Sequence, residues 1–453
     1  MESLWFETAL LPTGWEAPVR ITHANGLIVG VEAGAAAQEG DERGGIAIPG
    51  LGNVHSHAFQ RGMAGLAETR GPDADDFWSW RAVMYRFVDR LSPEDVEAIA
   101  ALAYVEMLES GFTRVGEFHY LHHDLDGRPY SDPARMAGAI AAAAGAAGIG
   151  LSLLPVFYAH GDFGGAAPTA GQRRFVNTPD SFARLLEDAR HIVRMLPDAV
   201  VGIAPHSLRA VTPDQLALIL PLAGDGPIHI HIAEQAREVE ACVAWCGRRP
   251  VEWLLDHAPV DDNWCLVHAT HMSEAETGRL AASGAVAGLC PITEANLGDG
   301  IFPAAPYFSA GGAFGVGSDS NVLIDAAEEL RMLEYGQRLI RQGRNVLASE
   351  HRPSVGAALF AGAHQGGARA LGARPLGLAP GAPADVVCLD AGHPSVIGRQ
   401  GDAFIDGWIF AARGGAVERV WRGGRKVVEG GRHVGRDIIA HAYRRTLARL
   451  LGA

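Results

Sequence analysis

Short runs of apolar residues recur along the middle of the chain, and each run ends in polar or histidine-rich residues. Apolar strands that alternate with helices indicate parallel strands covered on their outer face, and eight such units over residues 50 to about 340 favour a (β/α)8 barrel. In that fold, polar residues at the carboxyl ends of the strands are the candidates for chemistry. The eight runs are 50–59, 112–123, 150–160, 199–210, 227–235, 264–271, 284–296 and 313–321.

Amphipathic stretches between these runs predict helices. In residues 92–110, Ser92 has the position of an N-cap and Gly111 follows the last turn. Residues 178–196 begin with a similar Thr-Pro-Asp signal. The uncharged stretch 136–160 starts with alanine and glycine, which are too weakly apolar for a membrane span, so we expect a buried helix that leads into a buried strand.

The two ends of the chain differ from its middle. Residues 1–48 and 370–435 contain valine-rich runs that are interrupted by turns and lack a helical period, which predicts short antiparallel strands. We expect the two pieces to pair into one small β-sandwich domain beside a catalytic barrel at 49–369. Residues 436–453 predict a C-terminal helix. The expected fold class is therefore α/β, with a TIM-like barrel and a β domain built from both chain ends.

Composition narrows the possible partners. The chain has 453 residues, of which 48% are hydrophobic and 20% charged, as in a globular protein with a large core. Its net charge of −14 repels phosphate backbones and anionic lipids, so we expect no nucleic-acid or membrane partner. The five cysteines are an odd number, which argues against a disulfide framework. No secretory signal is visible at the N-terminus, and we expect a cytoplasmic protein.

Five residues at the predicted strand ends have metal-binding side chains. His55 and His57 end the first run and share one face, because side chains alternate along a strand. His231, His268 and Asp319 end the fifth, sixth and eighth runs. A His-x-His pair alone is common by chance among 19 histidines, but all five residues are expected at one mouth of the barrel. Three neutral imidazoles and a carboxylate suit Zn²⁺ or Fe²⁺, with a position left for water.

This combination resembles the amidohydrolase superfamily over nearly the whole chain, including the split β domain with its PGAPADVVCLD stretch at 380–390. Members with two metals usually need a carboxylated lysine or a glutamate on the fourth strand. The only lysine of this chain is Lys426, in the C-terminal strands, and the fourth strand ends in IAPHSLRA. The resemblance therefore implies a metal-dependent hydrolase with one divalent ion per chain, Zn²⁺ in preference to Fe²⁺. The implied ligands are His55, His57, His231 and Asp319.

In the mononuclear members that act on C=N bonds, a glutamate follows the histidine of the fifth strand by three residues. Glu234 has this position, although an ordinary exposed loop acid is the alternative interpretation. The resemblance implies that the metal acidifies a water and that Asp319 and His268 take its proton. Glu234 would then shuttle a proton to the substrate nitrogen so that ammonia leaves.

Several motifs resemble the family of N-formimino-L-glutamate iminohydrolases, also called formimidoylglutamate deiminases, of bacterial histidine degradation. The resemblance implies deamination of a linear amidine with two carboxylates to N-formyl-L-glutamate and ammonia. Arg209 is placed to bind a carboxylate, and Gln60, Arg81, Tyr120 and His206 are further implied substrate contacts. Each can instead form a local salt bridge or helix cap. The motifs are NVHSHAFQRGMAGLAE, FWSWRAVMYRF, GEFHYLH, APHSLRAV and HIHIAEQ.

Two other functions remain open at this point. A mononuclear-metal deaminase or chlorohydrolase of a heterocycle, such as guanine or a triazine, would use the same metal ligands. A non-catalytic scaffold of the same fold typically lacks those ligands. We expect a small dicarboxylate as substrate, a homodimer, and a packed core role for His229. No spacing argument assigns a role to His119, His122, His123, His160 or His271.

Overall fold

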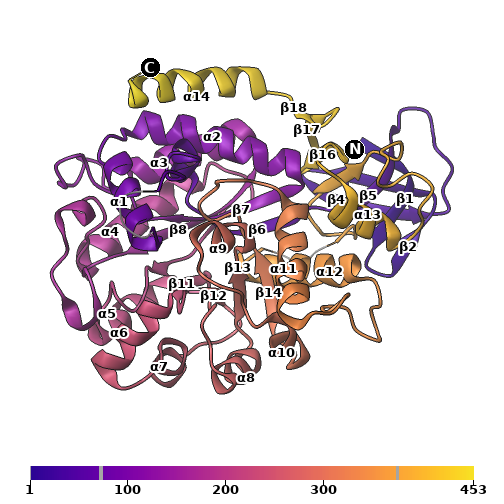
Figure 1. Ribbon diagram of the computed structural model, residues 1–453. Helices are drawn as coiled ribbons and strands as arrows, with labels where there is room; N and C mark the ends of the chain where they lie inside the picture. The colour runs from indigo at the N-terminus through magenta and orange to yellow at the C-terminus, as the bar shows by residue number, and fades with distance from the viewer. Residues whose placement is uncertain (1, 71–74, 374–376, 453) are drawn as a thin grey trace.

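The computed structural model of the protein describes residues 2–70, 75–373 and 377–452. A parallel sheet runs in the order β10-β8-β7-β6-β14-β13-β12-β11, with β9 paired to β8. Isolated bridges from Ile203 to Ile228 and from Ser207 to His231 join its two edges, which confirms the predicted barrel (Figure 1). The strands are β6 (Leu51–Ser56), β7 (Phe112–His119), β8 (Gly150–Phe157), β9 (Val200–Val201), β10 (Ala204–Pro205), β11 (Ile228–Ile232), β12 (Trp264–His268), β13 (Val286–Leu289) and β14 (Ala313–Val316).

The fourth run of the barrel differs from the single strand that was expected. It is divided into β9 and β10, and each piece has only two residues. The division falls near Gly202, where an added Cβ would lie 2.1 Å from the carbonyl oxygen of Pro227. The backbone therefore passes unusually close to the chain that enters β11, and the regular pairing is interrupted there.

Helices cover the outside of the barrel. Asp95 N donates to Ser92 Oγ at 3.3 Å at the start of α2, and Gly111 ends this helix with a φ of 105°, so both predicted ends are confirmed. The alanine-rich stretch forms α3 and continues into buried β8, as predicted. Among the described residues, no helix combines the length and apolar character that a membrane crossing requires. The helices are α1 (Phe77–Val88), α2 (Pro93–Ser110), α3 (Arg135–Ala147), α4 (Pro179–Val193), α5 (Pro213–Ile219), α6 (Ala236–Cys246), α7 (Pro250–His257), α8 (Glu274–Ser283), α9 (Pro291–Leu297), α10 (Ala304–Ser309), α11 (Ala326–Arg341) and α12 (Val355–Ala370), with short 3₁₀ turns η1 (Ala58–Met63), η2 (Phe163–Gly165), η3 (Ala170–Gln172) and η4 (Leu220–Ala223).

Both ends of the chain build a second sheet beside the barrel, as predicted (Figure 1). Its strands are hydrogen-bonded into one sheet, ordered β18-β17-β16-β15-β5-β1-β3-β4 with β2 on β1. Most pairs are antiparallel, but β1 and β5 are parallel, because residues 34–41 carry the chain back to the free edge of β1. The exact domain boundaries stay a prediction. The elements are β1 (Glu2–Leu11), β2 (Gly14–Glu16), β3 (Val19–Ala24), β4 (Leu27–Ala33), β5 (Glu42–Pro49), β15 (Val386–Leu389), α13 (Ala403–Ala411), β16 (Val417–Arg422), β17 (Arg425–Glu429), β18 (Arg432–His433) and the terminal helix α14 (Arg436–Leu451), which lies along α2.

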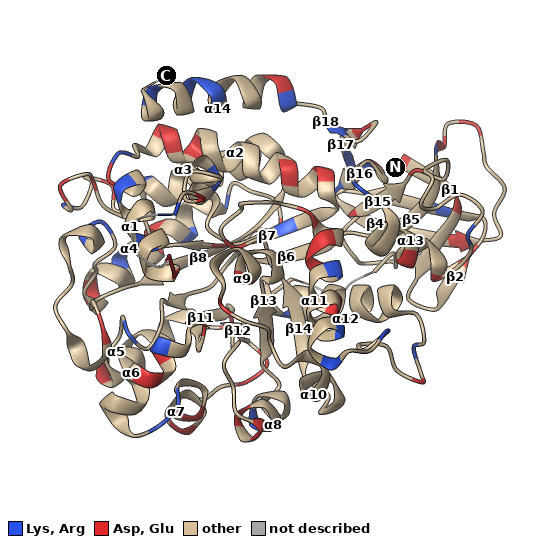
Figure 2. Cartoon of the chain, viewed as in Figure 1, with Lys and Arg blue, Asp and Glu red and all other residues tan. Residues whose placement is uncertain are grey.

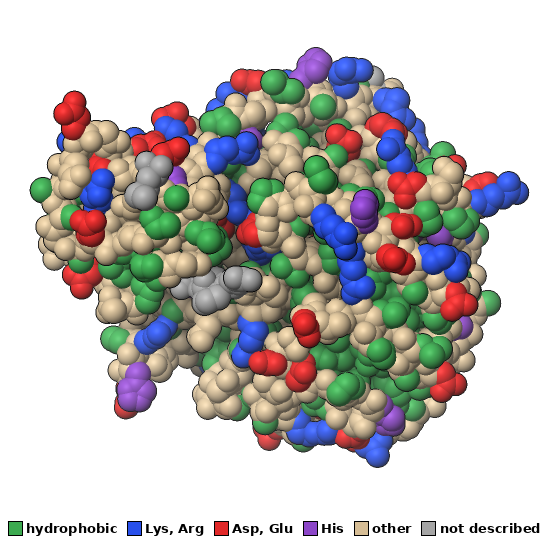
Figure 3. All heavy atoms as spheres, turned by 180° about the vertical axis from the view of Figure 1, so that it is seen from behind, with side chains coloured by type: hydrophobic (Ala, Val, Ile, Leu, Met, Phe, Trp, Pro, Cys, Tyr) green, Lys and Arg blue, Asp and Glu red, His purple; other side chains and the backbone are tan. Residues whose placement is uncertain are grey.

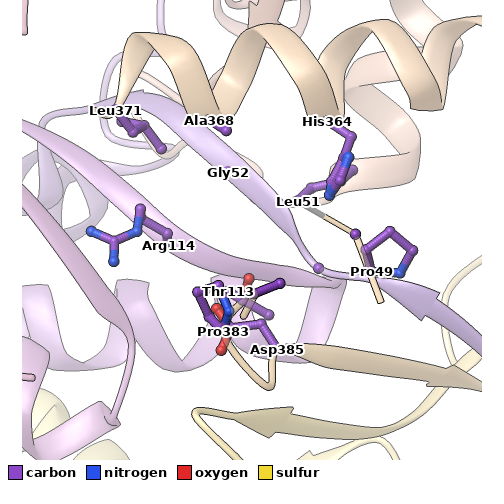
Figure 4. A pocket seen from close by; sticks show the side chains of 13 residues that line it. Pro49, Leu51, Gly52, Thr113, Arg114, His364, Ala368, Leu371, Pro383 and Asp385 are labelled. Carbon is purple, nitrogen blue, oxygen red and sulfur yellow. The ribbon is translucent and has the colours of Figure 1, made fainter. Parts of the chain in front are cut away.

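Ion pairs join the amino end of the barrel to the small sheet. Arg114 on β7 binds Asp198 at 2.5 Å, and Arg422 on β16 binds the second oxygen of the same carboxylate at 2.7 Å. Arg422 also lies 3.4 Å from Asp385 and donates to the carbonyl oxygen of Thr113 at 3.1 Å. Figure 4 shows the pocket at this base, with Arg114, Thr113 and Asp385 among the side chains that line it. At the amino end of the barrel, ion pairs therefore hold the barrel and the small sheet together.

Charged side chains elsewhere lie mainly on the outer helices and loops. Acidic and basic residues are interspersed along these elements (Figure 2) and over the face seen from behind (Figure 3). The overall charge of −14 therefore arises from a small excess of acids within a mixed surface. An anionic ligand would have to be attracted by local arginines, because the protein as a whole repels it.

Candidate active site

Four buried side chains meet at the carboxyl ends of β6, β11 and β14. Nε2 of His55 lies 3.2 Å from Nε2 of His57 and 3.0 Å from Nε2 of His231. Oδ1 of Asp319 lies 3.4 Å from Nε2 of both His55 and His57. Ligands at zinc distances and tetrahedral angles stand about 3.4 Å apart, so this spacing fits the coordination sphere of one ion.

The hydrogen bonds that the Nδ1 atoms of the imidazoles make determine which ring nitrogens carry no proton. Nδ1 of His57 lies 3.0 Å from the carbonyl oxygen of Phe118, and Nδ1 of His231 lies 3.2 Å from that of His206. A carbonyl can only accept, so each Nδ1 carries the proton and each Nε2 presents a lone pair. Burial lowers the pKa of His57 to about 3 and lowers the pKa of His231 as well, which keeps both rings neutral. Lone pairs that converge in this way repel one another unless a cation lies between them.

The ends of β6 and β14 are interlocked around Asp319. His57 N donates to the Asp319 carbonyl, and Asp319 N donates to the His55 carbonyl, both at 2.9 Å. Asn321 Nδ2 donates to Ser56 Oγ at 3.1 Å and to the Asp319 carbonyl at 3.0 Å. Burial by itself would raise the pKa of the Asp319 carboxyl, but the hydrogen bond to His55 and the positive charge of His268 hold it below its usual range. The carboxylate is therefore ionised and fixed in place.

Unusual backbone conformations concentrate at the same strand ends. Of the nine described non-glycine residues with positive φ, five belong to this mouth, with φ from 45° to 68°. Residues with a Cβ seldom adopt this left-handed region, and such strain clusters at functional sites. The five residues are Ala233, His268, Ala269, Asp319 and Asn321.

His268 connects the four converging side chains with a group of acids. Its Nε2 lies 3.7 Å from Glu234 Oε1 and 3.8 Å from Asp319 Oδ2, and its Nδ1 lies 3.3 Å from Glu294 Oε1. Burial alone would lower the pKa of His268, but the carboxylates of Glu234, Glu294 and Asp319 raise it to about 10. Burial also raises the pKa of Glu234 above its ordinary value. This carboxyl therefore holds a proton more readily than an exposed glutamate does.

A pocket opens above these groups. All five residues expected to contact a substrate line it, namely Gln60, Arg81, Tyr120, His206 and Arg209. His57, His231, Glu234, His268 and Asp319 reach the same space, so the structure brings the predicted chemistry and the predicted substrate contacts together. Further lining residues, which the sequence did not point to, are Phe77, Trp80, Met84, Thr293, Leu297 and Ser320.

Two arginines of this pocket have no acidic partner among the described residues. Arg209 is 7% exposed, and its Nε has no hydrogen-bond partner in the described part of the chain. Nη2 of Arg81 donates to the hydroxyl of Tyr158, at 3.2 Å. Both guanidinium groups lie over the ring of Trp78, at 5.7 Å for Arg209 and 5.4 Å for Arg81. Arg81 lies on helix α1.

Three neutral donors complete the wall. Gln60 Nε2 donates to the Tyr120 hydroxyl at 3.0 Å, while Gln60 Oε1 has no partner among the described residues. His206 Nδ1 lies 3.1 Å from Ser207 Oγ. A ligand with several oxygen atoms could therefore receive hydrogen bonds from the arginines, from Gln60 and from His206 at once.

Glu294 and Asp299 were missed by the sequence reasoning. Glu294 lies on α9, and Asp299 lies between Gly298 and Gly300, whose φ values of 70° and 127° mark a tight turn. The Gly-Asp-Gly triplet at 298–300, shortly after the seventh run, was the available signal. His229 packs in the core as predicted, with Nε2 2.7 Å from the Ala370 carbonyl. The histidines without an assigned role bind locally: His122 to Val156, His123 to Val176, His160 to Gln215 and His271 to Asp299, while His119 Nε2 is buried without a partner in the described chain.

Comparison with known proteins gives consistent matches. The model of the amidohydrolase family matches residues 46–427, and the model described as "Formimidoylglutamate deiminase HutF, N-terminal domain" matches residues 1–45. The chain is 50% identical to the formimidoylglutamate deiminase of Pseudomonas aeruginosa over 100% of both chains. It is 56% identical to an amidohydrolase from Brucella melitensis, whose crystal structure superposes with a TM-score of 0.97 over 100% of both chains. An adenosine deaminase from Xanthomonas campestris with bound zinc has the same fold at 23% identity and a TM-score of 0.81, over 100% of this chain and 98% of that one.

Proposed function

This chain belongs to the amidohydrolase family, and we propose that it hydrolyses N-formimino-L-glutamate to N-formyl-L-glutamate and ammonia, a step of histidine degradation. One molecule of water is consumed, the C=NH group becomes a formyl C=O, and the nitrogen leaves as ammonia. The observation that carries the proposal is the pocket that combines converging metal donors with two arginines lacking acidic partners in the described chain. The full-length identity with a formimidoylglutamate deiminase supports it.

We propose one divalent ion per chain, Zn²⁺ in preference to Fe²⁺, held by His55, His57, His231 and Asp319. Three neutral nitrogen donors and a carboxylate oxygen form a set that zinc accepts, and their converging lone pairs call for a cation. When bound, such an ion lowers the pKa of a water molecule so that hydroxide is available near neutral pH. A carboxylated lysine cannot bridge a second ion at the fourth strand, because the only lysine, Lys426, lies on β17.

The remaining groups are proposed to move protons. Asp319, whose carboxylate is ionised, accepts the proton of the attacking water, and His268, which lies 3.8 Å from Asp319 and holds its own proton, orients that water. Glu234 lies 3.7 Å from His268 and, because burial raises its pKa, it can hold a proton and deliver it to the departing nitrogen. Proton delivery to that nitrogen lets the C–N bond break with ammonia as the leaving group. No serine or cysteine nucleophile is needed.

The wall of the pocket is proposed to hold the two carboxylates. Arg209 and Arg81 supply planar guanidinium groups, which bind carboxylates through two parallel hydrogen bonds. Gln60, Tyr120 and His206 supply further donors to the same oxygens. A neutral heterocycle would leave the buried Arg209 without a counter-ion, whereas a dicarboxylate satisfies it. This difference favours the linear dianion over ring substrates such as guanine or a triazine.

We also propose that the protein acts in the cytoplasm as a homodimer. All five cysteines are free thiols, as in a reducing compartment. Leu339 and Ile340 on α11 are 78% and 60% exposed, and contact with a second copy would cover them. Light scattering that gives the mass of two chains would support the dimer, whereas the mass of one chain would contradict it.

One assay tests the proposed function. Ammonia release is measured with N-formimino-L-glutamate in parallel with guanine, cytosine and adenosine, using protein loaded with one equivalent of zinc. We expect efficient turnover of formiminoglutamate and no comparable turnover of the ring compounds. Preferential turnover of a heterocycle would replace the proposal with a ring deaminase, and no turnover of any compound by zinc-loaded protein would contradict both.

A further inference from the structure

A second group of metal-binding atoms lies beside the first. Glu234, His268 and Asp299 each offer one ligand atom within 4.8 Å of the other two. All three residues are buried, with exposures of 6%, 1% and 4%. Two carboxylate oxygens and one imidazole nitrogen form a donor set that Zn²⁺ accepts. We propose that these three residues form a second, weaker site for a divalent ion such as Zn²⁺, and that occupancy of this site inhibits the enzyme.

The three donor atoms lie within 4.8 Å of one another, close enough for one ion to draw them together. Nδ1 of His268 faces Glu294, so Nε2 is the nitrogen that faces Glu234, at 3.7 Å from Oε1. Zinc ligands in tetrahedral geometry stand about 3.4 Å apart, and a small adjustment of the glutamate brings the pair to that spacing.

Asp299 supplies an oxygen that lacks a partner. Its Oδ1 accepts a hydrogen bond from Gln235 Nε2, whereas its Oδ2 is buried and has no hydrogen-bond partner in the described part of the chain. An unsatisfied buried carboxylate oxygen is costly, and nearly all such atoms in folded proteins have a partner. A cation between Asp299, Glu234 and His268 would satisfy it. The unpartnered oxygen of Asp299 distinguishes these three residues from an ordinary cluster of acidic side chains.

A second layer of hydrogen bonds holds the donors, as is typical of metal sites. Glu294 Oε1 lies 3.3 Å from His268 Nδ1, and a carboxylate in that position orients a ligating imidazole and raises its basicity. The same residue fixes the turn that carries Asp299, because Asp299 N donates to the Glu294 carbonyl at 2.9 Å. Glu238 accepts from Glu234 N at 3.2 Å and so holds the end of β11.

The second site should be weaker than the first and should block the reaction. It has one imidazole and two mutually repelling carboxylates, whereas the first site has three imidazoles and one carboxylate. An ion held by Glu234 and His268 would occupy two of the three groups that the proposed mechanism uses to handle protons, and would fill the space where the formimino group must lie. The inhibition therefore rests on the proposed function, whereas binding of the second ion depends only on the three donors.

Calorimetric titration tests the site. Metal is removed with a chelator, Zn²⁺ is added back stepwise, and ammonia release from formiminoglutamate is followed in the same solutions. We expect one tight equivalent with rising activity, then a weaker equivalent with falling activity. Asp299→Asn keeps an oxygen for Gln235 but removes the charge. It should retain the first equivalent and weaken the second by at least about tenfold, the loss that even a second-layer partner of a metal ligand can cause.

A control and a second measurement guard against misinterpretation. Glu68→Gln removes an exposed carboxylate that accepts from Asn296 at 2.9 Å, and it should leave both equivalents unchanged. If Asp299→Asn does not fold, competition on the wild-type protein still decides, because saturating N-formyl-L-glutamate should displace the second ion and not the first. The proposal is overturned if wild type binds no second equivalent, or if Asp299→Asn binds it equally well. Failure of the proposed function would appear separately, as a first equivalent without activity on formiminoglutamate.

Discussion

The two ends of the barrel use arginine in opposite ways. At the amino end, Arg114 and Arg422 share the carboxylate of Asp198, and Arg422 also reaches Asp385. At the carboxyl end, Arg209 is buried to a similar degree but has no acidic partner among the described residues. A buried cation that is paired with an acid holds structural elements together. Removal of one partner leaves the other charge buried without a counter-ion, in surroundings of low dielectric constant. A buried cation without a counter-ion among the described residues is where we expect an anionic ligand to bind.

The histidines show the same contrast. His229, one layer below the mouth, donates its Nε2 hydrogen to the Ala370 carbonyl at 2.7 Å and so has a fixed structural partner. His55, His57 and His231 instead direct nitrogens toward one another at 3.0 to 3.2 Å. We therefore assign packing to His229 and metal binding to His231, although both lie on the same strand. The Nε2 of His229 donates to a carbonyl, whereas the Nε2 of His231 faces the Nε2 of His55 at 3.0 Å.

The largest effect is expected from His57→Ala, which removes one of the four converging donors. Even loss of a second-layer partner lowers metal affinity about 10- to 100-fold, so loss of a ligand should exceed that and abolish activity. Elemental analysis and ammonia release on the same preparation measure this. His229→Gln is the matched control, and it should keep both metal and activity while losing some stability. If the His57→Ala protein still held one zinc ion tightly, His57 would not be a metal ligand, and the proposed difference between His57 and His229 would be wrong.

Glu234→Gln should have the next largest effect. The amide keeps the shape of the side chain but cannot transfer a proton, a contribution of about 10²- to 10⁴-fold in rate. Metal content and the urea midpoint should stay near wild type, because the four converging donors and the base ion pairs are untouched. Steady-state kinetics on formiminoglutamate give the rate. Near wild-type turnover would assign proton delivery to another group.

At the amino end we expect the reverse result, a loss of stability without a loss of catalysis. Arg422→Met leaves Asp385 without its arginine and deprives Asp198 of one of two partners. Breaking a buried pair costs about 3 to 5 kcal/mol, and we expect the lower value of about 3 kcal/mol because water still reaches Asp198. The side chain of Asp198 is 37% exposed. Urea unfolding monitors the loss, while kcat/KM of the folded fraction should stay within about twofold. Unchanged stability would show that these pairs are incidental.

The sequence predicted the carboxyl end of the barrel, where the pocket lies, better than the amino end, where the small sheet packs, and the reason is physical. Barrel strands impose a period of two and end at one mouth, so His55, His57 and Asp319 were placed by strand position alone. Glu294 and Asp299 lie after strand ends too, but on a helix and a glycine turn whose approach to His268 depends on tertiary packing.

The amino end of the barrel is held by contacts between segments that are far apart in the sequence. Asp198 lies 84 residues from Arg114 and 224 from Arg422, and no local pattern pairs such positions. The parallel β1–β5 pairing was missed for the same reason, because it depends on the path of residues 34–41. The two-residue strands β9 and β10 follow from the close approach of Gly202 to Pro227, which a sequence pattern does not reveal.

The most direct test of the account is Arg209→Met, measured for kcat/KM on N-formimino-L-glutamate together with metal content and stability. If the guanidinium binds a substrate carboxylate, its loss removes hydrogen bonds to a charged group worth about 1.5 to 3 kcal/mol each. We predict that kcat/KM falls about 10²- to 10⁴-fold, with one zinc ion retained and no loss of stability, in contrast to Arg422→Met. A zinc-loaded Arg209→Met protein within about threefold of wild type would contradict the account, because Arg209 would then be structural and the dicarboxylate would lose its binding group.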